Sequence, residues 1–174
     1  MMLSAPLDPD QELPARPLAL HEEVVRPEWI DYNGHMNVAY YVLAFDHATD
    51  RLLDLIGLGM DYARSSGHST FVLETHVTYA QEVKLRDRLR FRAQLLDADA
   101  KRLHYFIEMH QGKDGYLAAT SEQIALHVDL AARRGAPIPD AAMRRVQALL
   151  AVHRDLPRPE AAGRVIGIRR ERAA

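Results

Sequence analysis

The 174 residues of this chain suit one domain, because domains typically contain about 100–150 residues and a chain of this size can bury a substantial core. A net charge of -2 and a pI near 6.5 argue against the positive field that nucleic-acid binding needs. The lack of cysteine excludes disulfides, thiolate catalysis and sulfur-bound metal. We expect a single domain with no nucleic-acid partner.

The N-terminal segment is rich in proline and acidic residues and has no long apolar run. This composition differs from that of a signal peptide, and the segment is too short to span a membrane. We therefore expect a flexible arm over residues 1–19 and a cytoplasmic protein with no membrane partner.

The first regular elements are a short strand and a long helix. Residues 20–29 predict a strand interrupted near Pro27, which fits a sheet edge or a strand end. The apolar residues that follow have the three-and-four spacing of one helical face: Val38, Tyr41, Val42, Phe45, Ala48, Leu52, Leu55 and Ile56. Asn37 suits the helix cap and Gly57 suits the position just past the helix end.

After a connection over 59–69 the apolar period changes to two, which predicts four strands: Phe71–Tyr79, Arg88–Leu95, Leu103–Met109 and Tyr116–Val128. Short turns at 97–100 and 112–115 make the last three an antiparallel meander. A final helix is expected from about Asp140, its cap, through Leu150. An arginine-rich tail, expected to be mobile, covers 156–174.

These elements predict an α+β fold in which an antiparallel sheet wraps around one long helix. Such a sheet leaves edges and part of a face uncovered, which favours pairing with further copies. We expect a homodimer or a homotetramer.

A dense polar segment joins the first strand to the long helix. Asp31 lies at the strand end, Gly34 lies in the connection, and Asn37 precedes the helix. Free amides at a helix N-terminus can stabilise an oxyanion, and a nearby carboxylate can act as nucleophile or as base toward water. The same pattern is also common in simple turns, with Asn37 acting only as a cap.

The segment from Asp31 to Asn37, followed by Tyr40 and Tyr41, resembles the Asp-x-x-Gly-His-(Met/Val)-Asn signature of hotdog-fold thioesterases of the 4-hydroxybenzoyl-CoA thioesterase type. The resemblance covers about residues 20–129 and implies a hotdog domain over 20–155. Two segments, Trp29–Asn37 and Leu95–His104, resemble more closely the betainyl-CoA thioesterases of carnitine breakdown than the wider thioesterase type.

The resemblance implies a catalytic carboxylate at Asp31, a carbonyl-polarising amide at Val38 and a close backbone approach at Gly34. His35 would line the pocket, and Asn37 would fix the helix start or position water. Glu74, beside His76, is an alternative carboxylate on the pocket wall, although a solvated strand face explains this pair about equally well.

Other side chains offer further binding roles. Five aromatic residues could form a cation–π cage for a trimethylammonium group or could simply belong to the core: Trp29, Tyr32, Tyr40, Tyr41 and Tyr79. Four basic residues could meet coenzyme A phosphates or form a solvated face: Arg86, Arg88, Lys101 and Arg102.

The remaining polar residues do not indicate a metal site. Asp46 and His47 are expected to make interface or solvent contacts. Because His35, His47 and His76 lack a metal-ligand spacing, we expect no metal and no cofactor, coenzyme A being part of the substrate.

The sequence therefore predicts an acyl-CoA thioesterase, with betainyl-CoA as the leading substrate. The alternatives are a hydratase or dehydratase acting on acyl thioesters, in which Asp31 and His35 move protons, and a non-catalytic acyl-CoA-binding module.

Overall fold

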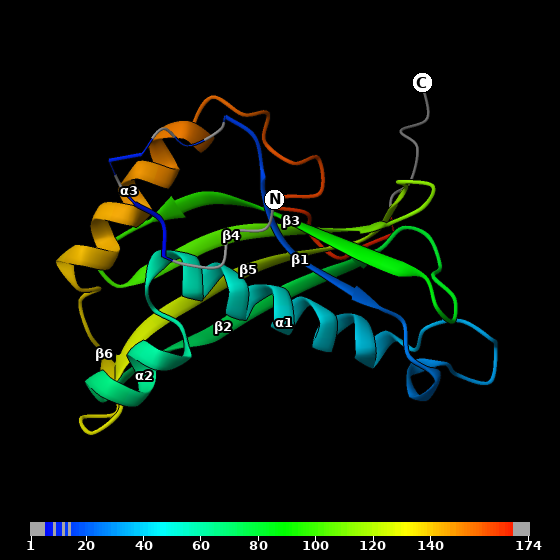
Figure 1. The fold of residues 1–174 in the computed structure, drawn as a ribbon, viewed down its shortest axis with the longest axis horizontal. Helices are drawn as coiled ribbons and strands as arrows, with labels where there is room; N and C mark the ends of the chain where they lie inside the picture. Colours follow the sequence, from blue (N-terminus) through cyan, green and yellow to red (C-terminus); the bar gives the residue numbers. More distant parts are fainter. Residues whose placement is uncertain (1–5, 9, 12, 14, 169–174) are drawn as a thin grey trace.

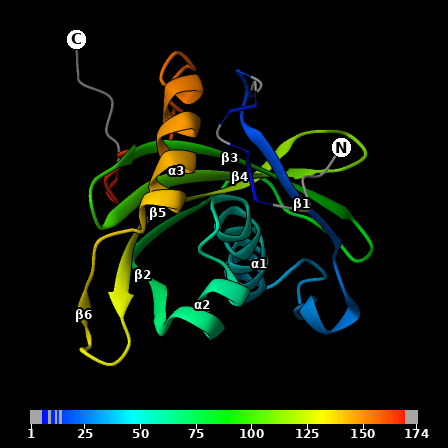
Figure 2. The same ribbon diagram turned by 60° about the vertical axis from the view of Figure 1, so that its left-hand side comes forward.

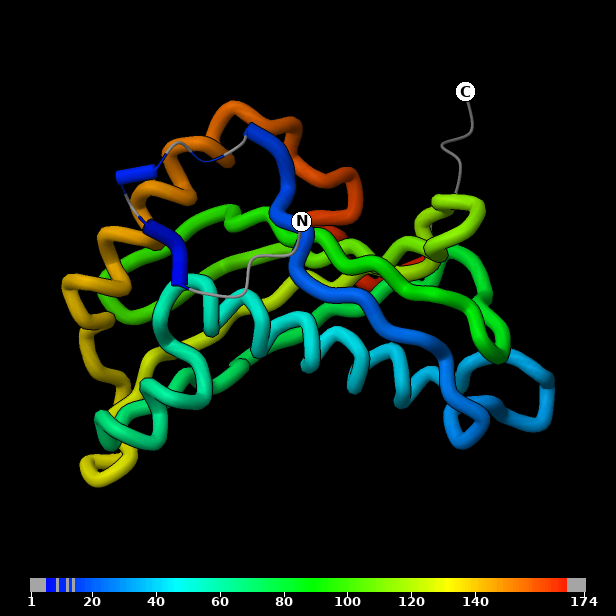
Figure 3. Tube along the Cα trace, in the orientation of Figure 1, coloured from blue at the N-terminus to red at the C-terminus, as the bar shows by residue number. Residues whose placement is uncertain are grey.

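A computed structural model describes residues 6–168 except 9, 12 and 14. Its strands are β1 (Leu18–Val24), β2 (His68–Tyr79), β3 (Arg88–Ala98), β4 (Arg102–Gln111), β5 (Leu117–Asp129) and β6 (Arg134–Gly135). Its helices are the 3₁₀ turn η1 (Pro27–Trp29), α1 (Val38–Ile56), α2 (Met60–Ser66) and α3 (Asp140–His153). Figures 1 and 3 show these elements along the chain.

The strands form one antiparallel sheet in the order β1-β3-β4-β5-β2, with β6 paired to β5. The sheet curls around α1, which lies on its concave side (Figure 2). This arrangement confirms the α+β hotdog fold. It leaves β1 and β2 as the two edges.

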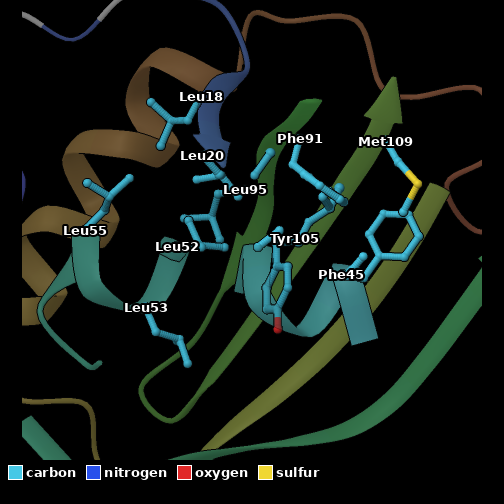
Figure 4. Close-up of a cluster of buried hydrophobic side chains, with 14 of the residues drawn as sticks. Leu18, Leu20, Phe45, Leu52, Leu53, Leu55, Phe91, Leu95, Tyr105 and Met109 are labelled. Atoms are coloured by element: carbon cyan, nitrogen blue, oxygen red, sulfur yellow. The ribbon is translucent and has the colours of Figure 1, made fainter. Parts of the chain in front are cut away.

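The core lies between α1 and the concave face of the sheet (Figure 4). Phe45 and Leu52 of α1 are at most 1% exposed and pack with inward-facing strand residues such as Phe91 and Tyr105. Alternation along β3 and β4 supplies this apolar layer, as the period of two predicts. Helix α3 adds Val146 and Leu149 to the same core.

Helix α1 has the predicted bounds. The Asn37 side chain accepts a hydrogen bond from the Ala39 amide, and Gly57 ends the helix with a φ of 80° in the left-handed region. Both predicted terminal residues are confirmed.

Several boundaries differ from the prediction. Strand β1 begins at Leu18 and ends at Val24, and Pro27 instead starts the η1 turn, where its fixed φ and missing N–H are tolerated. The cap of α3 is Pro139, so Asp140 is the first helical residue rather than the cap. Helix α2 and strand β6 were not predicted.

The two terminal segments also make contacts with the domain. Leu7 is 5% exposed and its amide donates to the Leu55 carbonyl at 2.7 Å. At the other end, the Gly163 amide donates to a Glu122 carboxylate oxygen at 2.6 Å, so part of the arginine-rich tail lies against β5. Residues 169–174 of that tail are outside the described part.

Candidate active site

A tight turn carries the polar segment from the strand end to α1. The Gly34 amide donates to the Asp31 carbonyl, and the Asp31 amide donates to the His35 carbonyl, each at 3.0 Å. The Asp31 carboxylate accepts the Asn33 amide at 2.8 Å. Gly34 has a φ of 83°, which L side chains rarely adopt, and a Cβ there would meet no atom within 4 Å. The backbone at Gly34 is therefore open to an approaching molecule.

Backbone hydrogen bonds attach this turn to the η1 turn and to the β2–β3 loop. The Asn37 amide donates to the Trp29 carbonyl at 2.8 Å, and the Met36 amide donates to the Val83 carbonyl at 3.0 Å. Val83 is fully buried in the β2–β3 loop. The turn is thus held from both sides at the N-terminus of α1.

The first amides of α1 are not equivalent. Asn37 accepts the Ala39 amide with its side chain and the Tyr40 amide with its carbonyl, both at 3.0 Å. Among the described residues, the Val38 amide has no hydrogen-bond acceptor. A free N–H at the positive end of a long helix can receive a polarised carbonyl oxygen.

Charged residues of the β2–β3 loop face the turn. His35 Nε2 lies 3.0 Å from a Glu82 carboxylate oxygen, and Lys84 Nζ lies 3.1 Å from the other oxygen. The Lys84 ammonium, followed by His35, holds the pKa of Glu82 below its usual range. His35 therefore has a carboxylate partner that can orient its ring.

Four of the five aromatic candidates form two pairs, and Tyr32 belongs to neither pair. The Trp29 and Tyr40 rings stack at 5.6 Å, and those of Tyr41 and Tyr79 meet edge to face at 5.2 Å. Trp29 is 2% exposed, and its ring already has the Arg26 guanidinium 5.1 Å from its centroid.

Tyr41 and Tyr32 differ most in exposure. Tyr41 is 4% exposed and its hydroxyl accepts the Val83 amide at 3.3 Å, while burial raises the pKa of this phenol. Tyr32 is 97% exposed at the tip of the turn. Trp29 and Tyr41 thus have core positions, and Tyr32 and Tyr79 present accessible rings.

Glu74 and His76 lie elsewhere on the sheet. Together with His104 and Glu122 they line a cavity of about 590 Å³ whose far wall is the tail segment 163–166. No residue of the 29–41 segment lines this cavity. Within a single chain the structure does not bring Glu74 and His76 together with Asp31.

Three of the four basic candidates have other partners or lie far from the Asp31 turn, whereas Arg86 lies in the β2–β3 loop that contacts this turn. Arg88 pairs with Glu22 at 3.6 Å, and Arg102 pairs with Asp99 at 2.6 Å. Lys101 and Arg102 lie at the β3–β4 turn, whereas the Asp31 turn contacts the β2–β3 loop at the other end of β3 (Figure 1). Arg86 has a left-handed φ of 68°, and its amide donates to the Val25 carbonyl.

The side chains of Asp46 and His47, both on α1, have different surroundings. Asp46 is exposed, whereas His47 Nδ1 lies 3.2 Å from a Glu23 carboxylate oxygen. His21 lies on the other side of this carboxylate. Histidine spacing within one helix could not reveal this group, because its members come from β1 and α1.

The loop residues Glu82, Val83 and Lys84 were not identified from the sequence. Only Val83, an apolar residue between charges, gives a local signal of burial. Their contact with the turn depends on how β2 and β3 meet α1, which no local pattern encodes.

In the part of the chain that the structure describes, no helix is both long and apolar enough to cross a membrane.

Comparison with known proteins finds relatives whose names include betainyl-CoA thioesterase. The chain is 46% identical over 151 residues to a betainyl-CoA thioesterase of Pseudomonas aeruginosa, covering 87% of this chain and 95% of that protein. It is 38% identical to an L-carnitine dehydrogenase/betainyl-CoA thioesterase of Rhizobium meliloti, covering 88% of this chain but only 31% of that longer protein.

A solved structure of a hypothetical protein from Staphylococcus aureus, in complex with CoA, matches with a TM-score of 0.81 and 28% identity over 88% of this chain and 97% of that one. The profile of the thioesterase-like superfamily matches residues 25–146. This match spans most of the chain and contains the Asp31 turn, α1 and strands β2 to β6, so the chain belongs to the thioesterase-like superfamily.

Proposed function

We propose that this protein is an acyl-CoA thioesterase that hydrolyses betainyl-CoA at the Asp31 turn. The observation that carries this proposal is a tight turn that contains the Asp31 carboxylate and leads directly to the unpaired Val38 amide at the start of α1. The fold similarity to a protein solved with CoA and the match to a betainyl-CoA thioesterase support it.

The chemistry needs only groups of this turn and water. The thioester carbonyl oxygen accepts the Val38 N–H, which stabilises the oxyanion formed on attack. The Asp31 carboxylate either removes a proton from the attacking water or attacks the carbonyl carbon itself to give an anhydride that water then opens. In both routes the C–S bond breaks, the sulfur leaves as the coenzyme A thiol after protonation, and the acyl group leaves as a carboxylic acid.

The other turn residues have supporting roles in this proposal. The open backbone at Gly34 lets the thioester approach, Asn37 fixes the helix start, and the His35 ring, held by Glu82, lines the pocket. The accessible rings of Tyr32 and Tyr79 are the available cation–π faces for a trimethylammonium acyl group. Tyr41 supports the Tyr79 ring edge to face, and Trp29 and Tyr40 stack on each other.

We further propose a homodimer formed along β2. This edge strand exposes Phe71 (51%), Val72 (42%) and Leu73 (58%). An exposed apolar edge favours pairing with a second copy, which would bury these side chains and bring the Glu74–His76 region close to another chain.

The test is release of free thiol from betainyl-CoA, acetyl-CoA, a medium-chain acyl-CoA and 4-hydroxybenzoyl-CoA. We expect preferential turnover of betainyl-CoA. A product that keeps its thioester would indicate the hydratase or dehydratase class, and acyl-CoA that binds but remains intact would indicate a binding module.

A further inference from the structure

A second group of metal-ligating side chains lies between β1 and α1. It consists of His21 and Glu23 on β1 and His47 on α1, whose ligand atoms all lie within 4.8 Å of one another. The Glu23 side chain is 8% exposed, His21 is 21% exposed and His47 is 34% exposed. The carboxylate is thus buried behind two more accessible imidazoles.

The distances in this group already approach those of a coordinated ion. Glu23 oxygens lie 3.2 Å from His47 Nδ1 and 3.6 Å from His21 Nε2. Tetrahedral zinc with bonds of about 2.0–2.1 Å separates its ligand atoms by roughly 3.4 Å. The two imidazole nitrogens lie within 4.8 Å of each other, so a bound zinc ion would need them to draw closer by at most about 1.4 Å.

Three nearby arginines form ion pairs with other carboxylates and not with Glu23. The neighbouring Glu22 pairs with Arg88 and Arg90, and Arg51 pairs with Asp54. Among the described residues, Glu23 forms ion pairs only with His21 and His47. No lysine or arginine there competes with a metal ion for this carboxylate.

The group also opens to a space that can hold further ligands. His21, Glu23 and His47 line a cavity of about 460 Å³ whose other charged lining residues are Glu22, Asp50, Asp54, Arg26 and Arg51. Water in this cavity could complete the coordination. Arg51 pairs with Asp54 and Arg26 lies over the Trp29 ring, so Asp50 is the aspartate that adds negative charge. A set of two imidazoles and one carboxylate suits Zn²⁺ or Co²⁺ better than Mg²⁺ or Ca²⁺, which prefer oxygen ligands.

We propose that His21, Glu23 and His47 form a binding site for a divalent transition-metal ion of the Zn²⁺ type. The site ties the edge strand β1 to α1. It lies about 13 Å along the helix from Val38, at 1.5 Å per residue, so it acts separately from the thioester site.

The test uses the full chain without a histidine tag, stripped of metal. Equilibrium dialysis with Zn²⁺ and visible absorption with Co²⁺ measure stoichiometry and affinity for the wild type, His47→Ala, Glu23→Gln and His110→Ala. His110 is the matched control, because it also pairs with a glutamate, Glu108, at 2.9 Å on β4.

We expect a single ion per chain in the wild type and in His110→Ala, with affinity at least about 10-fold lower in His47→Ala and Glu23→Gln. Chemical modification of histidines in the wild type, located by mass spectrometry, gives a readout that does not depend on the folding of variants. Zn²⁺ should protect His21 and His47 and leave His110 reactive.

Absence of Zn²⁺ and Co²⁺ binding in the wild type would overturn the proposal. So would equal affinity in folded His47→Ala, or protection of histidines outside this group.

Discussion

Asn37 pairs two of the first amides of α1. Its side-chain oxygen accepts the Ala39 amide and its carbonyl accepts the Tyr40 amide, whereas the Val38 amide has no acceptor among the described residues. Asn37→Ala should lower the free energy of unfolding by about 1 kcal/mol, because a lost N-cap leaves the Ala39 amide unpaired. Urea denaturation measures the change. Asn33→Ala, an exposed neighbour in the same turn, serves as control, and an equal loss in both variants would contradict a capping role.

Gly34 tests backbone strain in the turn. Its φ of 83° is unfavourable for alanine, although a Cβ would meet no atom within 4 Å. Gly34→Ala should therefore destabilise the protein by roughly 1–2 kcal/mol through the backbone alone. Gly167→Ala is the matched control, because that glycine is equally open but lacks a positive φ. A thermal melt that shows no difference between the two variants would argue against strain at Gly34.

At the residue scale, local patterns predicted the turn and the cap, since these depend on neighbours in the chain, and the choice of the Val38 amide came from the family resemblance. They could not predict the contacts from Glu82 and Val83 or the His21–Glu23–His47 group, whose members meet only after β1, the β2–β3 loop and α1 pack together. They also could not separate the buried Trp29 and Tyr41 from the exposed Tyr32.

At the element scale, the clearest periodicities predicted the structure best. Helix α1 has a continuous apolar face, and β3 alternates between exposed arginines and buried apolar residues. Helix α2 has no buried residue, so its sequence has no apolar face to detect. Strand β6 is too short for any period, and β2 alternates poorly because a bulge between Val72 and Glu74 shifts its register.

The docking of α3 should depend on pH through His153. This side chain is 2% exposed, and its Nδ1 accepts the Leu95 amide at 2.9 Å. Burial lowers the pKa of His153 below 6.5, so the unfolded chain binds the proton more readily. Its contribution to stability is complete above pH 6.5 and is lost as the pH falls from there through the lowered pKa.

His153→Asn keeps an acceptor near the Leu95 amide and removes the titration. Melting temperatures measured from pH 7.5 to pH 5 should fall less steeply in this variant than in the wild type. Parallel curves for the two proteins would show that His153 does not contribute to the pH dependence.

At the scale of the whole molecule, the two sheet edges differ. Strand β2 exposes Phe71, Val72 and Leu73, whereas β1 exposes Val24 (44%) beside charged residues. If β2 forms the dimer, Leu73→Lys should shift the mass measured by light scattering toward the monomer, because it places a charge at the paired edge. Val24→Lys on the other edge should leave the mass unchanged, and the reverse pattern would place the interface on β1.

The sequence could predict the wrapped sheet and the uncovered edge, but not how distant surfaces combine. Glu74 and His76 share a cavity with the tail segment 163–166, because the tail lies against β5. They do not lie beside Asp31 within one chain. A tail without regular periodicity gives no sign of where it packs.

The central claim is that the Asp31 carboxylate performs the hydrolysis. The most direct measurement is thiol release from betainyl-CoA by Asp31→Asn, compared with the wild type and with Asp129→Asn. Asp129 is the matched control, because its carboxylate also accepts an amide two residues further on, at 2.9 Å. We expect kcat to fall at least about 100-fold in folded Asp31→Asn and to remain unchanged in Asp129→Asn. Full turnover by folded Asp31→Asn would contradict the account and would direct attention first to Glu74.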